Sequence, residues 1–399
     1  MAGSMRAEVM HTSEASAQAD RNSEIRDVRA TILRMPTIRA HALSSTVMLD
    51  QRMVLVGIET RDGAVGIGEA ATINGLSYSE ESPDSIALTV RRYLAPQVLG
   101  RDAGDPAGIA AHLGKTTVGN HFSKMAVETA LWDLLGKRTG RSVGDVLGTP
   151  RTDRLSCVWT LASGDTQADI EEGRRMIAAR RHRDFKLKIG RRHWREDVAH
   201  CKAIREAFPD SSIRVDVNQG WSEETALAAL PALHEIGVEM VEQPLPVHAR
   251  EASLRLSELP QRPAIVLDEA LRGGPHALWG WTDRVDGVSL KIAQAGGLGN
   301  CRELAGRARA AGLSLYGGTM LEGPVATVAS AHLFATLPDM RWGTELFGPR
   351  LLAGSLLREP LRYEDFHLIV PTGPGLGVEL DPDAVRDAAR AERVHPSSN

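Results

Sequence analysis

Apolar and polar residues alternate with the two-residue period of a β-strand soon after the start of the chain. Residues 25–34 and 53–60 follow this pattern, and the turn Arg61-Asp62-Gly63 leads into a third run over 64–69. Side chains of a strand point alternately to the two faces of a sheet, so the pattern predicts a small sheet here. The stretch 36–49 is expected to connect its first two strands.

Two segments after this sheet have the pattern of helices instead. Ser82-Pro83-Asp84 is a helix start, and this helix is expected to run to about residue 94. Residues 123–138 place apolar side chains on one side, which predicts a second helix.

Beyond residue 150 the chain alternates short apolar runs with helical stretches. We expect strands at 155–162, 185–190, 214–218, 240–244, 265–269, 288–292, 313–318 and 340–346. We expect helices at 172–180, 196–207, 223–236, 251–259, 275–281, 300–311 and 325–337. Strands and helices that alternate in this way predict an α/β fold, a (β/α)7β modified TIM barrel whose last helix is missing or altered.

The pattern divides the chain into four parts. Residues 1–24 are expected to be a disordered leader, because they lack the apolar stretch of a signal peptide. Residues 25–150 are expected to form an α+β capping domain with a lid loop, and residues 151–350 the barrel. Residues 351–399 are expected to return to the capping domain, with 366–370 adding a strand to its sheet.

Charged residues recur at the ends of the predicted barrel strands. Lys186 and Lys188 share one face of their strand, because they are two residues apart. The later strand ends carry Asp216, Glu242, Asp268 and Lys291, which follow Lys188 at steps of 28, 26, 26 and 23 residues. Each step is about the length of one strand, one helix and two short loops. Because the carboxyl ends of barrel strands meet at one rim, these side chains are expected to face one another.

The three carboxylates at this rim have the chemistry of a site for a hard metal ion. Carboxylate oxygens of Asp216, Glu242 and Asp268 suit Mg²⁺ or Mn²⁺, with water or substrate oxygens completing about six ligands. No histidine or cysteine accompanies them at ligand spacing, which argues against zinc. The alternative for any one carboxylate is a salt bridge, but that alternative does not explain three in series.

Lysines beside such a metal site suit proton transfer next to a carboxylate. A divalent ion stabilises the enediolate that forms when a proton is removed from or added to the neighbouring carbon. A bound metal ion and nearby lysines disfavour the charged ammonium form of a lysine, so we expect a lowered pKa for Lys188 or Lys291. Lys186 is the expected partner that perturbs Lys188 and binds a substrate carboxylate. Schiff-base chemistry is the alternative use of buried lysine, but it leaves the carboxylates unexplained.

Two further stretches could border the site. The predicted seventh strand ends in Gly317-Gly318, Thr319 comes next, and Glu322 follows three residues later. The glycines would let the backbone approach a ligand closely, and Glu322 adds a polar group beside it. The stretch 71–78 contains Gly75 among apolar residues, which suits a lid and equally suits a plain connection.

Composition narrows the class of protein. The 399 residues are 42% hydrophobic and 25% charged with a formal charge of −4, as in an ordinary globular protein. No basic patch indicates a nucleic-acid partner, since residues 180–183 are more simply a solvated helix end than a phosphate site. No apolar run reaches the ~20 residues of a membrane span. Three well-separated cysteines without a CxxC pair favour reduced thiols in the cytoplasm.

Taken together, these residues resemble the enolase superfamily and, within it, the muconate lactonizing enzymes (muconate cycloisomerases) of the syn type. The shared metal-site features are the KxK strand, Asp216 with Asn218, Glu242 in an EQP run, Asp268-Glu269 and Lys291. Segments that resemble the muconate cycloisomerases more specifically are 75–78, 81–86, 159–165, 181–190, 316–323 and 344–349. The likeness covers nearly the whole chain from residue 25.

The resemblance implies metal-assisted conversion of cis,cis-muconate, a small dicarboxylate, to muconolactone in the β-ketoadipate route of aromatic catabolism. One carboxylate adds across the diene to give an enolate, which Lys188 protonates, while Lys291 acts mainly through its charge. Lys186 binds carboxylate, Glu269 orients Lys291 and Asn218 supports the metal ligands. We assign Glu322 to the catalytic set and substrate binding to Ile73, Tyr78, Thr160, Gly317, Gly318 and Thr319, with Ile73 and Tyr78 in the lid. The family commonly forms a homo-octamer.

Departures from the family pattern leave related activities open. Ile292 to Gly296 after Lys291, Gly343 before the Thr-Glu-Leu run and Asn74 beside the lid differ from the usual residues. Chloromuconate cycloisomerase, N-succinylamino-acid racemase and dipeptide epimerase are therefore alternatives, and the last two need both Lys188 and Lys291 as acid and base. A barrel that binds ligand without turnover is the alternative outside enzymes.

Overall fold

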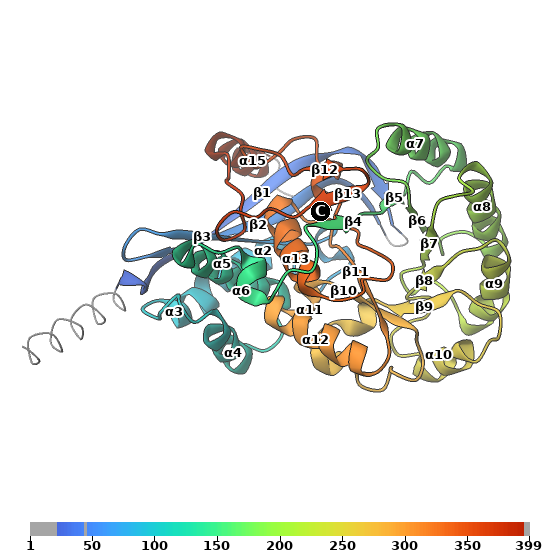
Figure 1. The fold of residues 1–399 in the computed structure, drawn as a ribbon, viewed down its shortest axis with the longest axis horizontal. Coiled ribbons are helices and arrows are strands. Elements are labelled where there is room, and N and C mark those ends of the chain that lie inside the picture. The colour runs from blue at the N-terminus through green and yellow to red at the C-terminus, as the bar shows by residue number, and fades with distance from the viewer. Residues whose placement is uncertain (1–21, 44–45, 395–399) are drawn as a thin grey trace, which may run out of the picture.

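A computed structural model describes residues 22–43 and 46–394 of the chain. It contains a curled parallel sheet with helices around its outside, and a β-rich N-terminal domain beside it (Figure 1). Most of the expected leader, residues 1–21, lies outside the described residues.

The N-terminal sheet is antiparallel in the order β1-β2-β3. Its strands are β1 Ile25–Ala42, β2 Val47–Thr60 and β3 Val65–Ala71. The expectation that 36–49 is a connection is wrong, because β1 continues through Pro36, which pairs with Asp50. Proline lacks a donor for a ladder but is tolerated at an edge, and β1 is the edge strand of this sheet.

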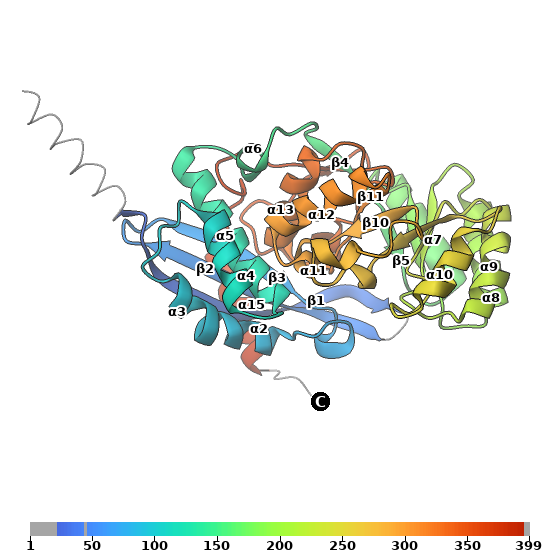
Figure 2. The same cartoon turned by 90° about the horizontal axis from the view of Figure 1, so that it is seen from below.

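Helix α5 (His121–Thr139) lies across this sheet, as Figure 2 shows. It approaches β3 closely because Gly66 and Gly68 have no side chains, and a Cβ added there would stand about 2 Å from the carbonyl oxygens of Ala130 and Ala126. The predicted helix over 123–138 is thereby confirmed. The predicted helix over 82–94 corresponds to α2 and the π-helical segment that continues it.

The other short helices of this domain complete its outer layer. Their bounds are α2 Pro83–Thr89, the π-helical segment Val90–Leu94, α3 Ala95–Val98, α4 Pro106–Thr116 and α6 Val143–Leu147, with a 3₁₀ turn at Gly75–Ser77. Ser82 and Ser85 form a reciprocal capping box at the start of α2, with Pro83 at the first helical position.

The barrel sheet has seven parallel strands within the described residues, in the order β11-β10-β9-β8-β7-β6-β5. The strands are β5 Trp159–Leu161, β6 Phe185–Lys188, β7 Ile213–Asp216, β8 Met240–Glu242, β9 Ala264–Leu267, β10 Gly287–Leu290 and β11 Ser314–Gly317. The helices are α7 Thr166–Ala178, α8 Trp194–Ala207, α9 Glu223–Glu235, α10 Arg250–Ser257, α11 Ile292–Ala295, α12 Leu298–Ala310 and α13 Pro324–Thr336.

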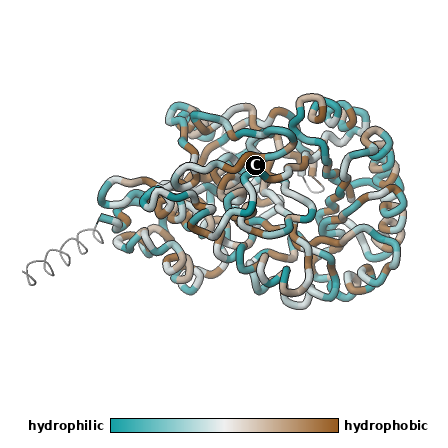
Figure 3. The backbone as a smooth tube through the Cα atoms, in the orientation of Figure 1, coloured by the Kyte–Doolittle hydropathy of each residue, from teal (hydrophilic) through white to brown (hydrophobic). Residues whose placement is uncertain are grey.

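Hydrophilic and hydrophobic residues alternate along the outer helices, as expected where one helix face covers a sheet (Figure 3). Helix α13 differs, because every residue from Pro324 to Ala335 is buried. The predicted helix over 275–281 is a single 3₁₀ turn, Pro275–Leu278, and a second such turn spans Glu269–Leu271.

The predicted eighth strand over 340–346 is wrong. This stretch turns at Gly343, whose φ is +67°, and joins the barrel through Thr344, which forms parallel bridges to Cys157 and to Gly317. Thr344 therefore connects the two ends of the seven-stranded sheet. The run of apolar residues that suggested a strand instead buries Trp342 and Leu346.

The C-terminal part of the chain contributes two strands to a separate three-stranded sheet, and its last helix packs on the N-terminal domain. β13 (His367–Ile369) pairs with β4 (Arg154–Ser156) and with β12 (Tyr363–Glu364), so the expectation that 366–370 joins the N-terminal sheet is wrong. After α14 (Gly348–Leu351), helix α15 (Pro382–Val394) packs on β1. An Arg52–Glu392 ion pair ties α15 to β2.

Two side chains of the N-terminal sheet hold the barrel loop after β11. Gln51 Nε2 donates to the Leu321 carbonyl over 2.7 Å, and Glu69 accepts the backbone N–H groups of Gly323 and Val325 at the start of α13. A carboxylate is favourable at a helix N-terminus, where N–H groups lack helical partners. These contacts fix this loop against the cap. None of the helices in the described segments is both long and apolar enough to cross a membrane.

Candidate active site

The three predicted acidic ligands meet at the carboxyl ends of adjacent strands. Asp216 ends β7, Glu242 ends β8 and Asp268 follows β9, and each is no more than 1% exposed. Each offers one carboxylate oxygen, and these oxygens lie within 4.8 Å of one another. Glu242 Oε1 and Asp268 Oδ1 are buried, and neither has a hydrogen-bond partner within residues 22–43 and 46–394.

This donor set fits a divalent cation. Three buried carboxylates close together repel one another, and burial together with Asp216 and Asp268 raises the pKa of Glu242 well above its usual value, against the lowering by Lys186. A hard cation between the oxygens would neutralise this repulsion and bind the two unpartnered oxygens. The surrounding polar groups hold the ligands in place, since Asp216 Oδ1 accepts the Asn218 N–H over 2.9 Å.

Lys186 is the buried cation between the carboxylates. Its Nζ lies 2.6 Å from Glu242 Oε2, 2.7 Å from Glu345 Oε2 and 3.2 Å from Asp216 Oδ2. Burial lowers the pKa of Lys186, but these carboxylates outweigh it and hold the pKa well above the usual range. These three carboxylates therefore favour the charged form of Lys186.

Lys188 and Lys291 approach the triad from different strands. Lys188 Nζ lies 2.6 Å from Asp216 Oδ2, and Lys291 Nζ lies 2.7 Å from Asp268 Oδ2. The expected lowering of a lysine pKa is not found at Lys291: burial does lower it, but Asp268 and Glu242 outweigh burial and raise the pKa. The carboxylate of Asp268, 2.7 Å from Lys291 Nζ, is a neighbour that the spacing of the strands does not reveal.

The expected supporting residues lie beside the triad with one difference in pairing. Asn218 Nδ2 donates to Glu269 Oε1 over 3.1 Å, and Asn218 Oδ1 lies 3.3 Å from Lys188 Nζ. Lys291 donates to Asp268 and to the Tyr78 hydroxyl rather than to Glu269 among the described residues. Within this part of the chain the hydrogen bonds of Lys291 therefore go to Asp268 and Tyr78, whereas Glu269 accepts from Asn218.

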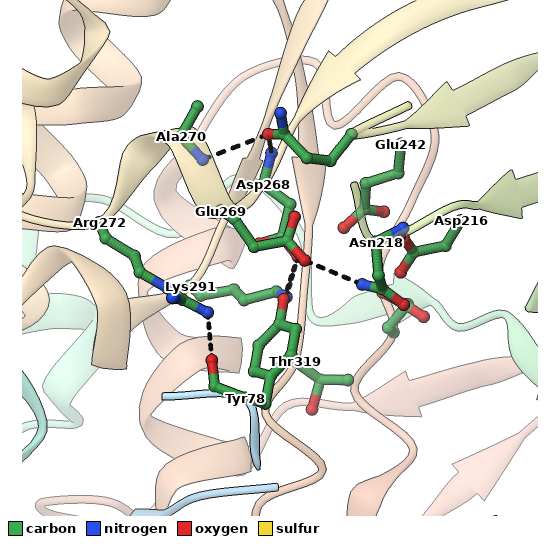
Figure 4. Close-up of polar contacts among 12 residues, drawn as sticks. Tyr78, Asp216, Asn218, Glu242, Asp268, Glu269, Ala270, Arg272, Lys291 and Thr319 are labelled. Carbon is green, nitrogen blue, oxygen red and sulfur yellow. Dashed lines mark hydrogen bonds and ion pairs between the residues drawn. The ribbon is translucent and has the colours of Figure 1, made fainter. Parts of the chain in front are cut away.

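Tyr78 closes the site from the capping domain, as Figure 4 shows. Its hydroxyl donates to Asp268 Oδ2 over 2.5 Å, and its ring lies under the Lys291 ammonium at 5.4 Å. Arg272 donates to the Tyr78 carbonyl, and its guanidinium stacks 5.0 Å from the same ring. Ile73 is buried and borders the same cavity as Tyr78.

The cavity next to the triad gathers most of the expected substrate positions. It is lined by His41, Leu43, Ile73, Tyr78, Thr160, Lys186, Lys188, Lys291, Thr319, Leu321 and Glu345. Thr319 donates to Glu322, which is buried behind it rather than exposed at the rim. Gly318 packs on Lys291, whereas the open side of Gly317 faces Phe334 and Thr344 and its carbonyl accepts the backbone N–H of Glu345 over 2.7 Å.

Five residues of this site were missed from the sequence: the cavity residues His41, Leu43, Leu321 and Glu345, and Arg272 against Tyr78. Glu345 accepts from Lys186 and, over 3.1 Å, from the Thr160 hydroxyl. Glu345 lies in the stretch 340–346 that was interpreted as a strand, and it does not follow the regular spacing that placed the other charged residues at strand ends. His41 lies at the end of β1, in a stretch interpreted as a connection.

Two family models match the chain. The model described as mandelate racemase / muconate lactonizing enzyme, N-terminal domain, matches residues 27–148. The model described as enolase C-terminal domain-like matches residues 168–384.

Individual relatives cover nearly the whole chain. Muconate cycloisomerase 1-1 of Acinetobacter lwoffii is 47% identical over 92% of this chain and 96% of that protein. A chloromuconate cycloisomerase of Cupriavidus necator is 41% identical over 92% of this chain and 100% of that protein. The crystal structure of a muconate lactonizing enzyme from Pseudomonas fluorescens complexed with muconolactone has a TM-score of 0.90 at 42% identity, over 92% of this chain and 99% of that one.

Proposed function

The chain belongs to the mandelate racemase / muconate lactonizing enzyme family of the enolase superfamily, and from that premise we propose that it cycloisomerises cis,cis-muconate to muconolactone in aromatic catabolism. One observation carries the proposal. In a chain 47% identical to a muconate cycloisomerase, Asp216, Glu242 and Asp268 surround one point, with Lys188 and Lys291 each within 2.7 Å of one of them.

The enzymes of this superfamily use a divalent metal, and here Mg²⁺ or Mn²⁺ held by Asp216, Glu242 and Asp268 is the proposed ion. When bound, it supplies Lewis-acid stabilisation of negative charge on a substrate carboxylate.

The residues of the chain supply binding and the proton. Lys186, fixed by three carboxylates, attracts one carboxylate of the substrate. The other carboxylate forms a C–O bond to the diene and closes the lactone ring. The displaced electron pair makes the carbon next to the first carboxylate basic, and Lys188 Nζ gives that carbon its proton. Lys291, paired with Asp268, stabilises the developing charge without giving up a proton.

Closure by the capping domain supports this chemistry. Ile73 and Tyr78 cover the cavity, and the Tyr78 hydroxyl bonds to Asp268, so the pair excludes water from the reacting carbon. Thr160, Thr319 and Gly318 are the proposed substrate contacts on the barrel side, and Glu322 holds the Thr319 hydroxyl.

The assembly and location proposed are those the resemblance implies, a cytoplasmic homo-octamer that acts by syn addition. The three free, buried cysteines, Cys157, Cys201 and Cys301, agree with a reducing compartment. Light scattering of the purified protein tests the octamer, and a mass near 43.1 kDa would contradict it.

Chloromuconates are the second candidate substrates, because chloromuconate cycloisomerases are also relatives at 41% identity. The test is a panel of cis,cis-muconate, 2-chloromuconate and N-succinyl amino acids with Mn²⁺-loaded protein. Loss of the diene absorbance with muconate, at kcat/KM above that for the other compounds, supports the proposal. Racemisation of the N-succinyl amino acids without muconate turnover would replace it.

A further inference from the structure

His41 borders the active-site cavity with one ring nitrogen unused. It lies at the end of β1, is 0% exposed and lines the cavity together with Lys186 and Lys188. Its Nε2 atom has no hydrogen-bond partner among the described residues. A buried polar atom without a partner is unfavourable, so such an atom at a ligand cavity points to a ligand.

Arg39 determines which ring nitrogen carries the proton. The Nδ1 atom of His41 lies 3.3 Å from the Arg39 guanidinium, which can only donate, so Nδ1 must accept. Burial, Arg39 and the two site lysines all lower the pKa of His41 well below its usual value, which keeps the ring neutral. A neutral ring whose Nδ1 accepts has its proton on Nε2, and the unused atom is therefore a donor.

Arg39 is itself held rigidly. Its Nε donates to Glu172 Oε1 over 2.8 Å, and its remaining nitrogens donate to the carbonyls of Thr160 at 2.9 Å and of Ala40 at 3.0 Å. Thr160 is a cavity residue on β5, so the same arginine joins the end of the cap strand to the barrel wall. The orientation of His41 is thus fixed by contacts from both domains.

We propose that His41 binds the substrate directly, its Nε2–H donating a hydrogen bond to a carboxylate oxygen of the bound dicarboxylate. The inference rests on the proposed function and adds a specificity-determining residue to it. Carboxylate oxygens only accept, so the donor matches them. The lysines that line the cavity with His41 already contact Asp216, Glu242 and Glu345, whereas His41 Nε2 has no competing partner in the described part of the chain.

Two matched variants test the donor position. His41→Gln carries its amide N–H near the place of Nε2, whereas His41→Asn reaches only the place of Nδ1 and can pair with Arg39. With metal-loaded protein and cis,cis-muconate, His41→Asn should raise KM roughly 10- to 100-fold, the worth of one hydrogen bond to a charged group. His41→Gln should stay within about threefold of the parent, and the melting temperatures should agree.

The outcomes separate this inference from the proposed function. Unchanged KM in His41→Asn, or equal losses in both variants at equal melting temperature, would overturn the role of His41 alone. Failure of the parent protein to convert muconate would overturn both. A crystal structure with bound muconolactone should place Nε2 within about 3.2 Å of a ligand oxygen, and a separation beyond about 3.5 Å would refute the contact.

Discussion

The Nζ atom of Lys188 lies 2.6 Å from Asp216 Oδ2, so the proposed proton donor touches the first of the three carboxylates. β6 and β7 are neighbours in register, with Lys188 opposite Asp216, and this pairing sets the contact. The proposed proton donor, Lys188, and the proposed metal ligand, Asp216, are thereby held by two adjacent, hydrogen-bonded strands.

Replacing Lys188 by alanine should lower kcat for muconate at least about 100-fold, because it removes the proposed proton donor. Circular dichroism should show an unchanged fold. Lys202→Ala on α8, an exposed lysine, is the control and should keep full activity. Retained turnover in Lys188→Ala would show that Lys188 is not the proton donor.

Loss of one carboxylate ligand should weaken metal binding by more than the 10- to 100-fold typical of outer partners. Addition of Mn²⁺ should raise the melting temperature of the parent protein, since a ligand of the folded state stabilises it, and should raise that of Glu242→Gln much less. Glu258→Gln, at the exposed end of α10, should behave as the parent does. Equal Mn²⁺ titrations for Glu242→Gln and the parent would contradict the site.

Acid should destabilise the protein partly through His182. Burial lowers its pKa to about 4, against the raising effect of the Cys157 carbonyl that faces Nδ1 at 2.9 Å. Between pH 6.5 and about 4 the unfolded chain therefore binds more protons at His182 than the folded chain does. The contribution of the neutral His182 to the free energy of unfolding is complete above pH 6.5 and is lost as the pH falls through this range. The shift corresponds to about 3 kcal/mol in the free energy of unfolding.

His182→Asn keeps an N–H donor near Nδ1 and has no proton to gain. Urea unfolding at pH 7 and pH 4 should show a loss of stability smaller by about 3 kcal/mol than in the parent protein. His248→Asn, at an exposed position, should follow the parent. The same pH slope in His182→Asn and in the parent would show that His182 is not responsible.

Arg272 should hold the Tyr78 loop closed. It bonds the Tyr78 carbonyl and stacks on the ring, so Arg272→Ala should free the loop and raise KM several-fold with a smaller effect on kcat. Backbone amides of residues 75–79 should exchange with solvent faster in this variant. Arg307→Ala on the exposed face of α12 is the control. Unchanged exchange in Arg272→Ala would mean that other contacts close the loop.

Periodic features of the sequence predicted the part of the site that the barrel strands carry. Five of its residues lie at or just after a strand end, because a repeating strand and helix fixes their spacing: Lys188, Asp216, Glu242, Asp268 and Lys291. Lys186 lies two residues before the end of β6 and shares a face of that strand with Lys188. The residues that were missed lack such a repeat. Glu345 follows the turn at Gly343, and His41 and Arg272 reach the site from a cap strand and a loop.

Pairing partners of short strands were also beyond the sequence pattern. The apolar pattern of residues 366–370 is compatible with pairing either to the N-terminal sheet or to β4. In the structure the segment pairs with β4, whereas helix α15 packs against β1 of the N-terminal sheet. Pro36 suggested a break, yet an edge strand tolerates it. Such choices depend on tertiary contacts, which an apolar pattern does not encode.

The most direct test of the account is the reaction in D₂O with Mn²⁺-loaded protein and cis,cis-muconate, followed by ¹H NMR. A lysine ammonium exchanges with solvent, so the account predicts muconolactone with one deuterium on the carbon next to its free carboxylate, formed by the parent protein and not by Lys188→Ala. Unchanged muconate in the presence of bound metal, or the same labelled product at the parent rate from Lys188→Ala, would contradict it.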